Sequence, residues 1–179
     1  MKTFHTKNAE ETQALAAKLV KQWRGGDVIG LVGDLGAGKT TFVQGVAKAL
    51  GVKRAVRSPT FLRMQVYPVP VIAIRQPAEK QSHGVGIAAS SDRGRSPRND
   101  SFKYFVHIDA YRIKNPEELQ ELGLEDYLGR TDTLIVIEWA ERVKKILPRK
   151  MRWIRFGYGK REGDRTVSGW YMDNDSLFC

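Results

Sequence analysis

Apolar residues in the first fifty positions recur in two helical patterns, with a buried strand between them. Their spacing predicts an amphipathic helix over 8–23, a strand over 28–32 and a second helix over 39–50. Asn8 followed by Glu11 resembles a capping box at the start of the first helix. The expected inner face of that helix is Leu15, Ala16, Leu19, Val20 and Trp23.

The rest of the chain alternates short apolar runs with weaker helical patterns. Strands are predicted over 62–67, 103–109 and 133–138, short helices over 115–128 and 141–147, and a hairpin over 151–172. Asn115 would cap the first of these helices, with Pro116 at its first position and a break near Gly123. Strands alternating with helices predict an α/β layer fold with a mostly parallel sheet and an antiparallel edge.

One stretch, at about 70–101, follows neither pattern. It mixes Gly, Ser, Pro, Arg and Lys in no periodic order, and structureless loops longer than about 12–15 residues are uncommon in compact domains. We expect a single domain over 1–179 with a mobile insertion at about 70–101, which is either disordered or a lid.

Charge and composition narrow the classes of protein. No apolar run approaches the roughly 18–20 residues of a membrane span, the first residues lack a secretory signal, and the single cysteine, Cys179, has no partner in the chain. A cytoplasmic protein is therefore expected. The formal net charge is +10, yet 104–147 carries a net −3. A basic balance fits contact with a polyanion, but no arginine-rich run or aromatic series accompanies it, so the charge leaves direct nucleic-acid contact open.

The strongest chemical signal is GDLGAGKT at 33–40, a complete P-loop motif between a predicted strand and a predicted helix. Its glycines let backbone N–H groups close around phosphate oxygens, and the helix N-terminus adds partial positive charge. Lys39 would reach the β- and γ-phosphates, and the Thr40 hydroxyl would bind Mg²⁺. The predicted nucleotide-binding residues are Asp34, Leu35, Gly36, Ala37, Gly38, Lys39, Thr40 and Thr41.

A P-loop site also needs acidic groups at the ends of neighbouring strands. Asp109 ends YFVHID and Glu138 ends TLIVIE, so an aspartate for the metal and a glutamate for water are both expected near the phosphates. Thr60, in SPTF, lies where switch threonines sense the γ-phosphate and metal. His107 is interpreted as a strand side chain rather than a catalytic base. The absence of an Asn-Lys-x-Asp motif argues against guanine recognition.

Four motifs in this order, GDLGAGKTTF, SPTF, HIDAYR and IEWAE, together resemble the TsaE (YjeE-type) family of tRNA threonylcarbamoyladenosine biosynthesis. The resemblance covers about 3–68 and 104–170. It implies a P-loop NTPase-like, three-layer fold and a small ATPase that binds ATP or ADP with Mg²⁺ and works with the TsaD–TsaB complex.

Carried onto this chain, the resemblance gives roles to single residues. Lys39 and Glu138 become the catalytic residues, and the metal residues are Thr40, Thr60, Asp109 and Glu138. Trp139 matches a paired tryptophan whose role the sequence does not explain.

The chain departs from the family pattern in two places. Thr60 and His107 are separated by 46 residues, where the family has a much shorter link, so the insertion puts partner contacts in doubt. Ala110 stands where the family commonly has leucine, a change that affects packing more than chemistry.

The leading hypothesis is a Mg²⁺-dependent ATP hydrolase, weak without partners, that supports tRNA modification and contacts tRNA indirectly if at all. A nucleotide or small-molecule kinase is the first alternative, with an arginine lid formed by Arg75, Arg93, Arg95 and Arg98. The second alternative is a nucleotide-gated scaffold with negligible hydrolysis.

Overall fold

The computed structural model describes residues 2–57, 63–70 and 102–173, with side chains from 3 to 169 within those ranges. Thr60, the four arginines of the proposed lid and nearly all of the predicted insertion lie outside the described residues. The elements are β1 (Lys2–Thr6), α1 (Ala9–Val20), β2 (Val28–Val32), α2 (Lys39–Ala49), β3 (Met64–Pro68), β4 (Tyr104–Asp109), α3 (Glu118–Glu121), η1 (Leu124–Asp126), β5 (Thr133–Glu138), η2 (Ala140–Ile146), β6 (Lys150–Tyr158) and β7 (Arg165–Asp173).

All seven strands form one mixed sheet in the order β1-β7-β6-β2-β5-β4-β3. The four central strands, β6-β2-β5-β4, run parallel. The pairings outside them are antiparallel on both sides, β3 with β4 on one side, and β7 with β6 and β1 with β7 on the other. The predicted parallel centre is therefore confirmed, but the sheet has two antiparallel edges instead of one.

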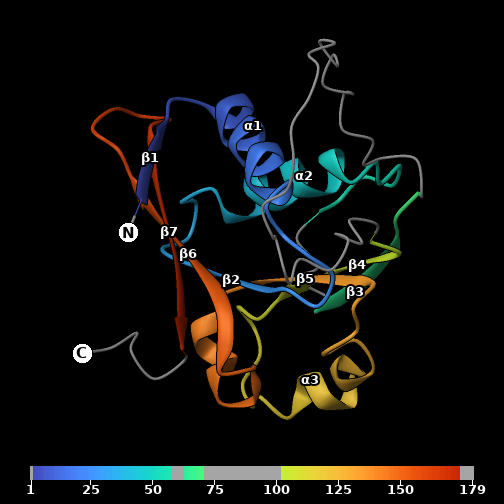
Figure 1. The fold of residues 1–179 in the computed structure, drawn as a ribbon. Coiled ribbons are helices and arrows are strands. Elements are labelled where there is room, and N and C mark those ends of the chain that lie inside the picture. The colour runs from blue at the N-terminus through green and yellow to red at the C-terminus, as the bar shows by residue number, and fades with distance from the viewer. Residues whose placement is uncertain (1, 58–62, 71–101, 174–179) are drawn as a thin grey trace, which may run out of the picture.

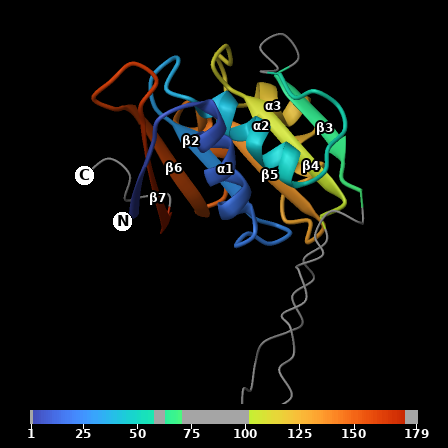
Figure 2. The same cartoon turned by 90° about the horizontal axis from the view of Figure 1, so that it is seen from above.

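Helices cover both faces of this sheet. Figure 1 shows α1 and α2 on one face and α3 with the orange η2 turns on the other, and Figure 2 shows α1 and α2 lying across the central strands. The buried side chains form two clusters, one on each face. The central strand β2 supplies both, since Ile29 and Leu31 pack toward α1 and α2 while Val28 and Val32 pack toward η2.

Glycine brings helices close to the core at two positions. A Cβ at Gly45 of α2 would lie 2.6 Å from the backbone of Gln13 in α1, so only glycine permits this close packing of the two helices. A Cβ at Gly30 of β2 would lie 2.9 Å from the Ala140 side chain at the start of η2. The placement of η2 against β2 therefore depends on a glycine in the strand.

The first helix begins as its sequence predicts. The Asn8 side chain accepts a hydrogen bond from the Glu11 amide at 2.8 Å, which satisfies one of the first free N–H groups of α1. The Glu11 carboxylate accepts from the amide of Lys7 at 2.9 Å, one residue earlier than a capping box requires. The helix ends at Val20, and Trp23 packs into the core from the turn that follows.

The predicted helical segment over 115–128 is only partly confirmed. The Glu118 carboxylate accepts from the amide of Asn115 at 2.9 Å, which is the return hydrogen bond of a capping box, and also from the amide of Lys114 at 2.9 Å. The chain stays in a turn until the four-residue α3, and Gly123, with φ 80°, separates α3 from η1. The start and the break near Gly123 follow the prediction, but only 118–121 and 124–126 are helical.

Three short elements remain. The predicted short helix over 141–147 is present as a 3₁₀-helix over 140–146. The edge strand β1 has no counterpart in the prediction, because its five residues, KTFHT, give too short a pattern. The hairpin of β6 and β7 is confirmed.

Candidate functional site

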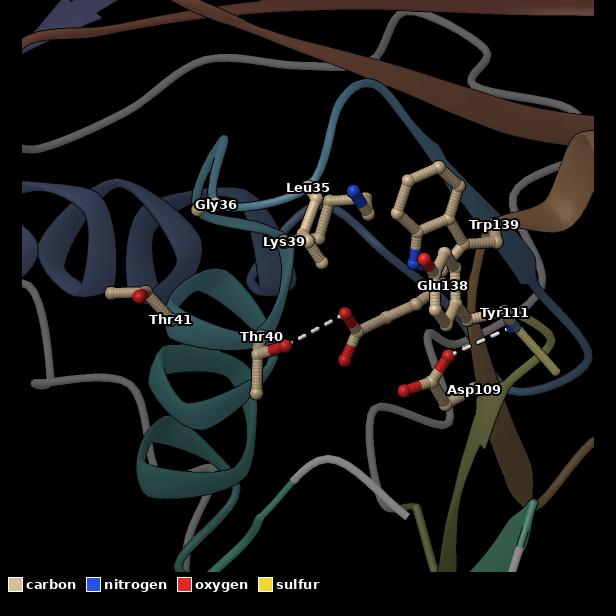
Figure 3. Close-up of a pocket in the computed structure, with 10 residues that line it drawn as sticks. Leu35, Gly36, Lys39, Thr40, Thr41, Asp109, Tyr111, Glu138 and Trp139 are labelled. Atoms are coloured by element: carbon tan, nitrogen blue, oxygen red, sulfur yellow. Dashed lines mark hydrogen bonds between the residues drawn. The ribbon is translucent and has the colours of Figure 1, made fainter. Parts of the chain in front are cut away.

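A cleft of about 260 Å³ opens where β2, β5 and β4 end. Figure 3 shows its two sides. The loop side is the segment 33–41, which joins β2 to α2, and the strand side is Asp109 and Tyr111 at the end of β4 with Glu138 and Trp139 at the end of β5. The carboxyl ends of parallel strands form the usual binding edge of an open α/β sheet.

Lys39 is the buried cation of the loop side. Its side chain is 4% exposed, and the ammonium donates to the carbonyl oxygens of Gly33 at 2.7 Å and Asp34 at 2.8 Å. Burial lowers the pKa of this ammonium, and nearby carboxylates, Glu138 foremost, act in the opposite direction. The loop thus holds a buried cation whose partners are weak neutral acceptors, which a stronger anionic ligand can replace.

Asp109 and Glu138 are paired across the parallel strands β4 and β5, each as the last residue of its strand. Both are buried, at 5% and 2% exposure. The Asp109 carboxylate accepts from the amide of Tyr111 at 3.0 Å. The structure therefore brings together the two acids that the strand ends predict.

Glu138 connects the two sides. One carboxylate oxygen, Oε2, accepts from the Thr40 hydroxyl at 2.8 Å (Figure 3), and the other, Oε1, lies 2.9 Å from Nε2 of His107. Thr40 and Glu138 are 98 positions apart in sequence, so only the tertiary fold makes this contact. Thr40, which the P-loop motif predicts to bind a metal, is thus hydrogen-bonded to Glu138, the acid at the end of β5.

His107 has a role that sequence reasoning missed. It is fully buried in β4, one position before Ile108, and its ring nitrogen fixes Glu138 from behind the cleft. Among the described residues its Nδ1 has no hydrogen-bond partner, so the contact with Glu138 is the one hydrogen bond that the His107 side chain makes there. The interpretation of His107 as a strand side chain holds, but it is also the group that orients the candidate catalytic acid.

Trp139 lies between the two sides of the cleft. Its backbone is left-handed, with φ 57°, which is costly for a bulky residue, and its ring centroid lies 3.7 Å from the Lys39 ammonium. Tyr111 packs on the same ring at 4.9 Å between centroids. Strain of this kind persists where surrounding structure fixes it, and here it places an aromatic ring over the buried lysine.

The other predicted loop residues divide into groups. Leu35, Gly36, Gly38 and Thr41 line the cleft, although Figure 3 shows the Thr41 side chain directed away from Glu138. Ala37 is fully buried. Asp34 is exposed and lies on the far side of the loop, so its side chain does not line the cleft.

A second cavity of about 290 Å³ lies behind the loop, and Trp139 separates it from the cleft. Glu141, which the sequence analysis did not select, lines this cavity together with Arg155. One oxygen of Glu141 is buried with no hydrogen-bond partner in the part of the chain that the structure describes, and burial raises the pKa of its carboxyl group. The motif IEWAE contained this residue, but its spacing gave no reason to place it near Lys39.

The hairpin of β6 and β7 supports the loop from outside. The hydroxyl of Tyr158 donates to the carbonyl of Leu35, and Nε of Arg165 donates to the carbonyl of Gly36 at 3.3 Å. Tyr158 is the last residue of β6, which pairs with β2, and Arg165 is the first residue of β7, so the turn of this hairpin lies against the loop.

Within the described ranges, no group of three or more His, Cys, Asp or Glu side chains is placed to hold a metal ion unaided. No helix in the part of the chain that the structure describes has the length and apolar character that a bilayer crossing needs.

The fold and the site together define a single-sheet α/β protein in which a P-loop sequence motif faces two acids from adjacent parallel strands. The family model described as "Threonylcarbamoyl adenosine biosynthesis protein TsaE" matches residues 6–75 and 96–167. The chain belongs to the TsaE family, whose role lies in tRNA threonylcarbamoyladenosine biosynthesis. Residues 76–95, between the two matched ranges, fall within the predicted insertion.

Individual proteins agree with the family match. The chain is 33% identical over 169 residues to the TsaE protein of Bacillus subtilis, with 93% of this chain and 85% of the relative covered. It is 34% identical over 140 residues to that of Streptomyces coelicolor, with 77% and 74% covered. The crystal structure of Bacillus subtilis YdiB matches with a TM-score of 0.62 and 26% identity, over 96% of this chain and 85% of that one.

Proposed function

We propose that this chain is a Mg²⁺-dependent ATPase with a P-loop NTPase fold, which supports threonylcarbamoyl modification of a tRNA adenosine together with a TsaD–TsaB-type complex. The contact between the Thr40 hydroxyl and Glu138 carries the proposal. It joins the P-loop motif, which binds phosphate and metal in other proteins, to an acid placed to act on water.

The charges at the site support a divalent cation between the two sides. Lys39 is one buried cation, and the carboxylates that act on it are those of Glu138, Glu141, Asp109 and Asp34. A triphosphate entering this site would be repelled by these acids unless a cation lay between them. Mg²⁺ bound to nucleotides typically takes one or two protein oxygens and fills its remaining positions with phosphate oxygens and water. Thr40 and Asp109 fit that requirement, although no cluster in the described chain could hold the ion alone.

Lys39 and Thr40 would exchange partners when ATP binds. The Lys39 ammonium would leave the carbonyls of Gly33 and Asp34 for phosphate oxygens, which form stronger charge-assisted hydrogen bonds. The Thr40 hydroxyl would turn from Glu138 to the metal and so release one oxygen of that carboxylate. The site would then hold a buried carboxylate with one free oxygen and one oxygen fixed by His107.

The chemical step follows from that carboxylate. Glu138 would accept a proton from a water molecule as the water oxygen attacks the γ-phosphorus of ATP. The bond from the γ-phosphorus to the bridging oxygen breaks, and the electron pair leaves with ADP. Lys39 would neutralise the charge on the phosphates, and His107 would keep Glu138 directed into the cleft.

The pathway part of the proposal rests on family membership. TsaE proteins act in tRNA modification, a cytoplasmic process, so we assign this chain to the cytoplasm and to a partner complex of the TsaD–TsaB type. The nucleotide would supply either energy or a conformational signal to that complex.

Phosphate release measured with the purified chain, with and without the TsaD–TsaB complex and tRNA, tests the proposal. We expect slow Mg²⁺-dependent release that the complete mixture accelerates. ATP binding without release in any mixture would favour the nucleotide-gated scaffold instead. Transfer of the phosphoryl group to a nucleoside or small alcohol would favour a kinase.

A further inference from the structure

A run of basic residues follows the site strand on the face opposite α1 and α2. Residues 142–152 contain six basic side chains and no acidic one. Four of the six are exposed, and we refer to these four as the η2–β6 basic surface: Arg142, Lys145, Arg149 and Lys150. Arg152, at the end of the run, is paired with Asp27 at 3.1 Å, and Lys144 is partly buried.

The 3₁₀ geometry of η2 places Arg142 and Lys145 on the exposed side of this helix. Residues three apart in a 3₁₀-helix lie on the same side. Ala140 and Val143 are fully buried and form the inner row, while Arg142 and Lys145 form an outer row. The helix is fixed against the sheet by this inner row and by the close approach of Ala140 to Gly30. The outer cations are therefore displayed on a rigid support.

The position of η2 separates Arg149 and Lys150 from the nucleotide cleft. The helix begins after Trp139 at the carboxyl end of β5 and returns the chain to Lys150 at the amino end of β6, as the orange turns below the sheet in Figure 1 show. The cleft lies at the carboxyl ends of the same parallel strands. A ligand on Arg149 and Lys150 would thus leave the cleft open.

Charge on the neighbouring segment limits where a polyanion could lie. Residues 115–129 contain five acidic side chains and no basic one, and they pack into the same core layer as η2 through Leu119 and Leu124. This face of the sheet therefore has an acidic part, formed by α3, η1 and the turns beside them, and a basic part along η2. A polyanion is attracted to one part and repelled by the other, which favours a defined orientation.

We propose that the η2–β6 basic surface binds the phosphate backbone of tRNA. The family's role in tRNA modification supplies the class of polyanion. The surface consists of cations without an exposed aromatic ring among them, and such a surface binds backbone phosphates instead of reading bases. The inference goes beyond the proposed ATPase and does not depend on ATP hydrolysis, so each can fail without the other.

The test measures binding of the full chain to a fluorescently labelled, unmodified tRNA transcript in a series of salt concentrations without nucleotide. The variant replaces all four residues: Arg142→Gln, Lys145→Gln, Arg149→Gln and Lys150→Gln. Each lost phosphate contact should lower the slope of log affinity against log salt by about one. We expect the variant to bind at least about tenfold more weakly at about 0.1 M salt.

A second variant with the same change in net charge is the matched control. It carries four exposed lysines of the α1 and α2 face replaced by glutamine: Lys18, Lys21, Lys48 and Lys53. This variant should bind tRNA as the wild type does. An equal loss of affinity in both variants would mean that only net charge matters and would overturn the proposal.

Two further results decide the remaining cases. Unchanged tRNA binding by the η2–β6 variant would overturn the proposal, and lost binding to the TsaD–TsaB complex by that variant would then assign the surface to a protein partner. Thermal unfolding checks that the fourfold variant is folded. If it is not, the single variants Lys145→Gln and Arg149→Gln should each lower the salt slope by about one, and no change in either would contradict the proposal.

Discussion

The two sides of the cleft are built in different ways. The loop side is one continuous segment, 33–41. The spacing of its glycines, lysine and threonine in the sequence is enough to identify it. The strand side is assembled from β4 and β5, and the contacts of Glu138 join residues 31 and 98 positions apart. Short-range spacing thus encodes the proposed phosphate-binding loop, whereas the proposed chemistry depends on strand register.

Mutations on the two sides should impair the site in different ways. A defect on the loop side should weaken nucleotide binding, because that side holds the charge that meets the phosphates. A defect on the strand side should leave binding largely intact and reduce metal use or turnover. The following substitutions test this division.

Lys39→Met should give the largest effect on nucleotide binding. It removes the buried cation while keeping a side chain of similar length, so ATP affinity should fall about 100-fold. Isothermal titration with ATP and Mg²⁺ measures the change. Lys48→Met, at an exposed position of the same helix, is the control and should bind as the wild type does. Similar affinities for the two variants would remove Lys39 from the site.

Asp109→Asn should alter metal use more than nucleotide binding. The amide oxygen can still accept from the amide of Tyr111, but the charge that attracts the cation is lost. We expect the Mg²⁺ concentration for half-maximal turnover to rise about tenfold. Asp126→Asn, an exposed change in η1, should leave it unaltered. A Mg²⁺ dependence equal to that of the wild type would show that Asp109 is structural.

His107→Phe should affect both stability and turnover moderately. The change leaves Oε1 of Glu138 buried without its partner, which costs about 1–3 kcal/mol of unfolding free energy. Turnover should fall several-fold because Glu138 loses its orientation. His107→Gln, which keeps a donor, should recover part of the turnover at equal ATP affinity, while His5→Phe on β1 controls for exposed histidine loss. No recovery with glutamine would argue against the positioning role.

Glu141→Gln should produce the smallest effect. The prediction is its direction: the variant should be more stable than the wild type at neutral pH. Burial raises the pKa of the Glu141 carboxyl group, and the cations Lys39, Arg142 and Arg155 oppose that shift. A carboxyl group with a raised folded-state pKa destabilises the fold increasingly as pH rises past its unfolded value of 4.5. The variant should therefore be more stable than the wild type at pH 7 and equal to it near pH 3. Thermal unfolding across that range measures the difference, and an advantage confined to low pH would contradict it.

Sequence could predict what short spacing determines. The loop, the helix cap at Asn8 and the strand ends at Asp109 and Glu138 follow from local patterns, and the register of β4 and β5 confirms that the two acids are neighbours. The contact of His107 with Glu138 and the left-handed Trp139 depend on packing between elements, which one sequence does not reveal. The segment 115–128 shows the opposite failure, since a local pattern for a helix start is followed by only four α-helical residues before Gly123.

The basic surface on η2 was also hidden by the way charge was divided along the chain. Residues 142–152 extend past the end of the acidic segment 104–147. The six basic residues are therefore divided between two segments, and the net charge of each segment conceals them. Folding places the acidic residues of 115–129 in a separate part of the same face. Charge arguments from sequence are therefore best made in windows as short as the elements themselves.

The most direct test of the two-sided site is Glu138→Gln, measured for ATP affinity and for phosphate release under the same conditions. The amide keeps the size and the hydrogen-bonding positions toward Thr40 and His107 but cannot accept a proton from water. We predict ATP affinity within about threefold of the wild type and phosphate release reduced by about 10²–10³-fold, with Glu125→Gln as the exposed control. Phosphate release at the wild-type rate would contradict the account, as would a loss of affinity as large as the loss of turnover.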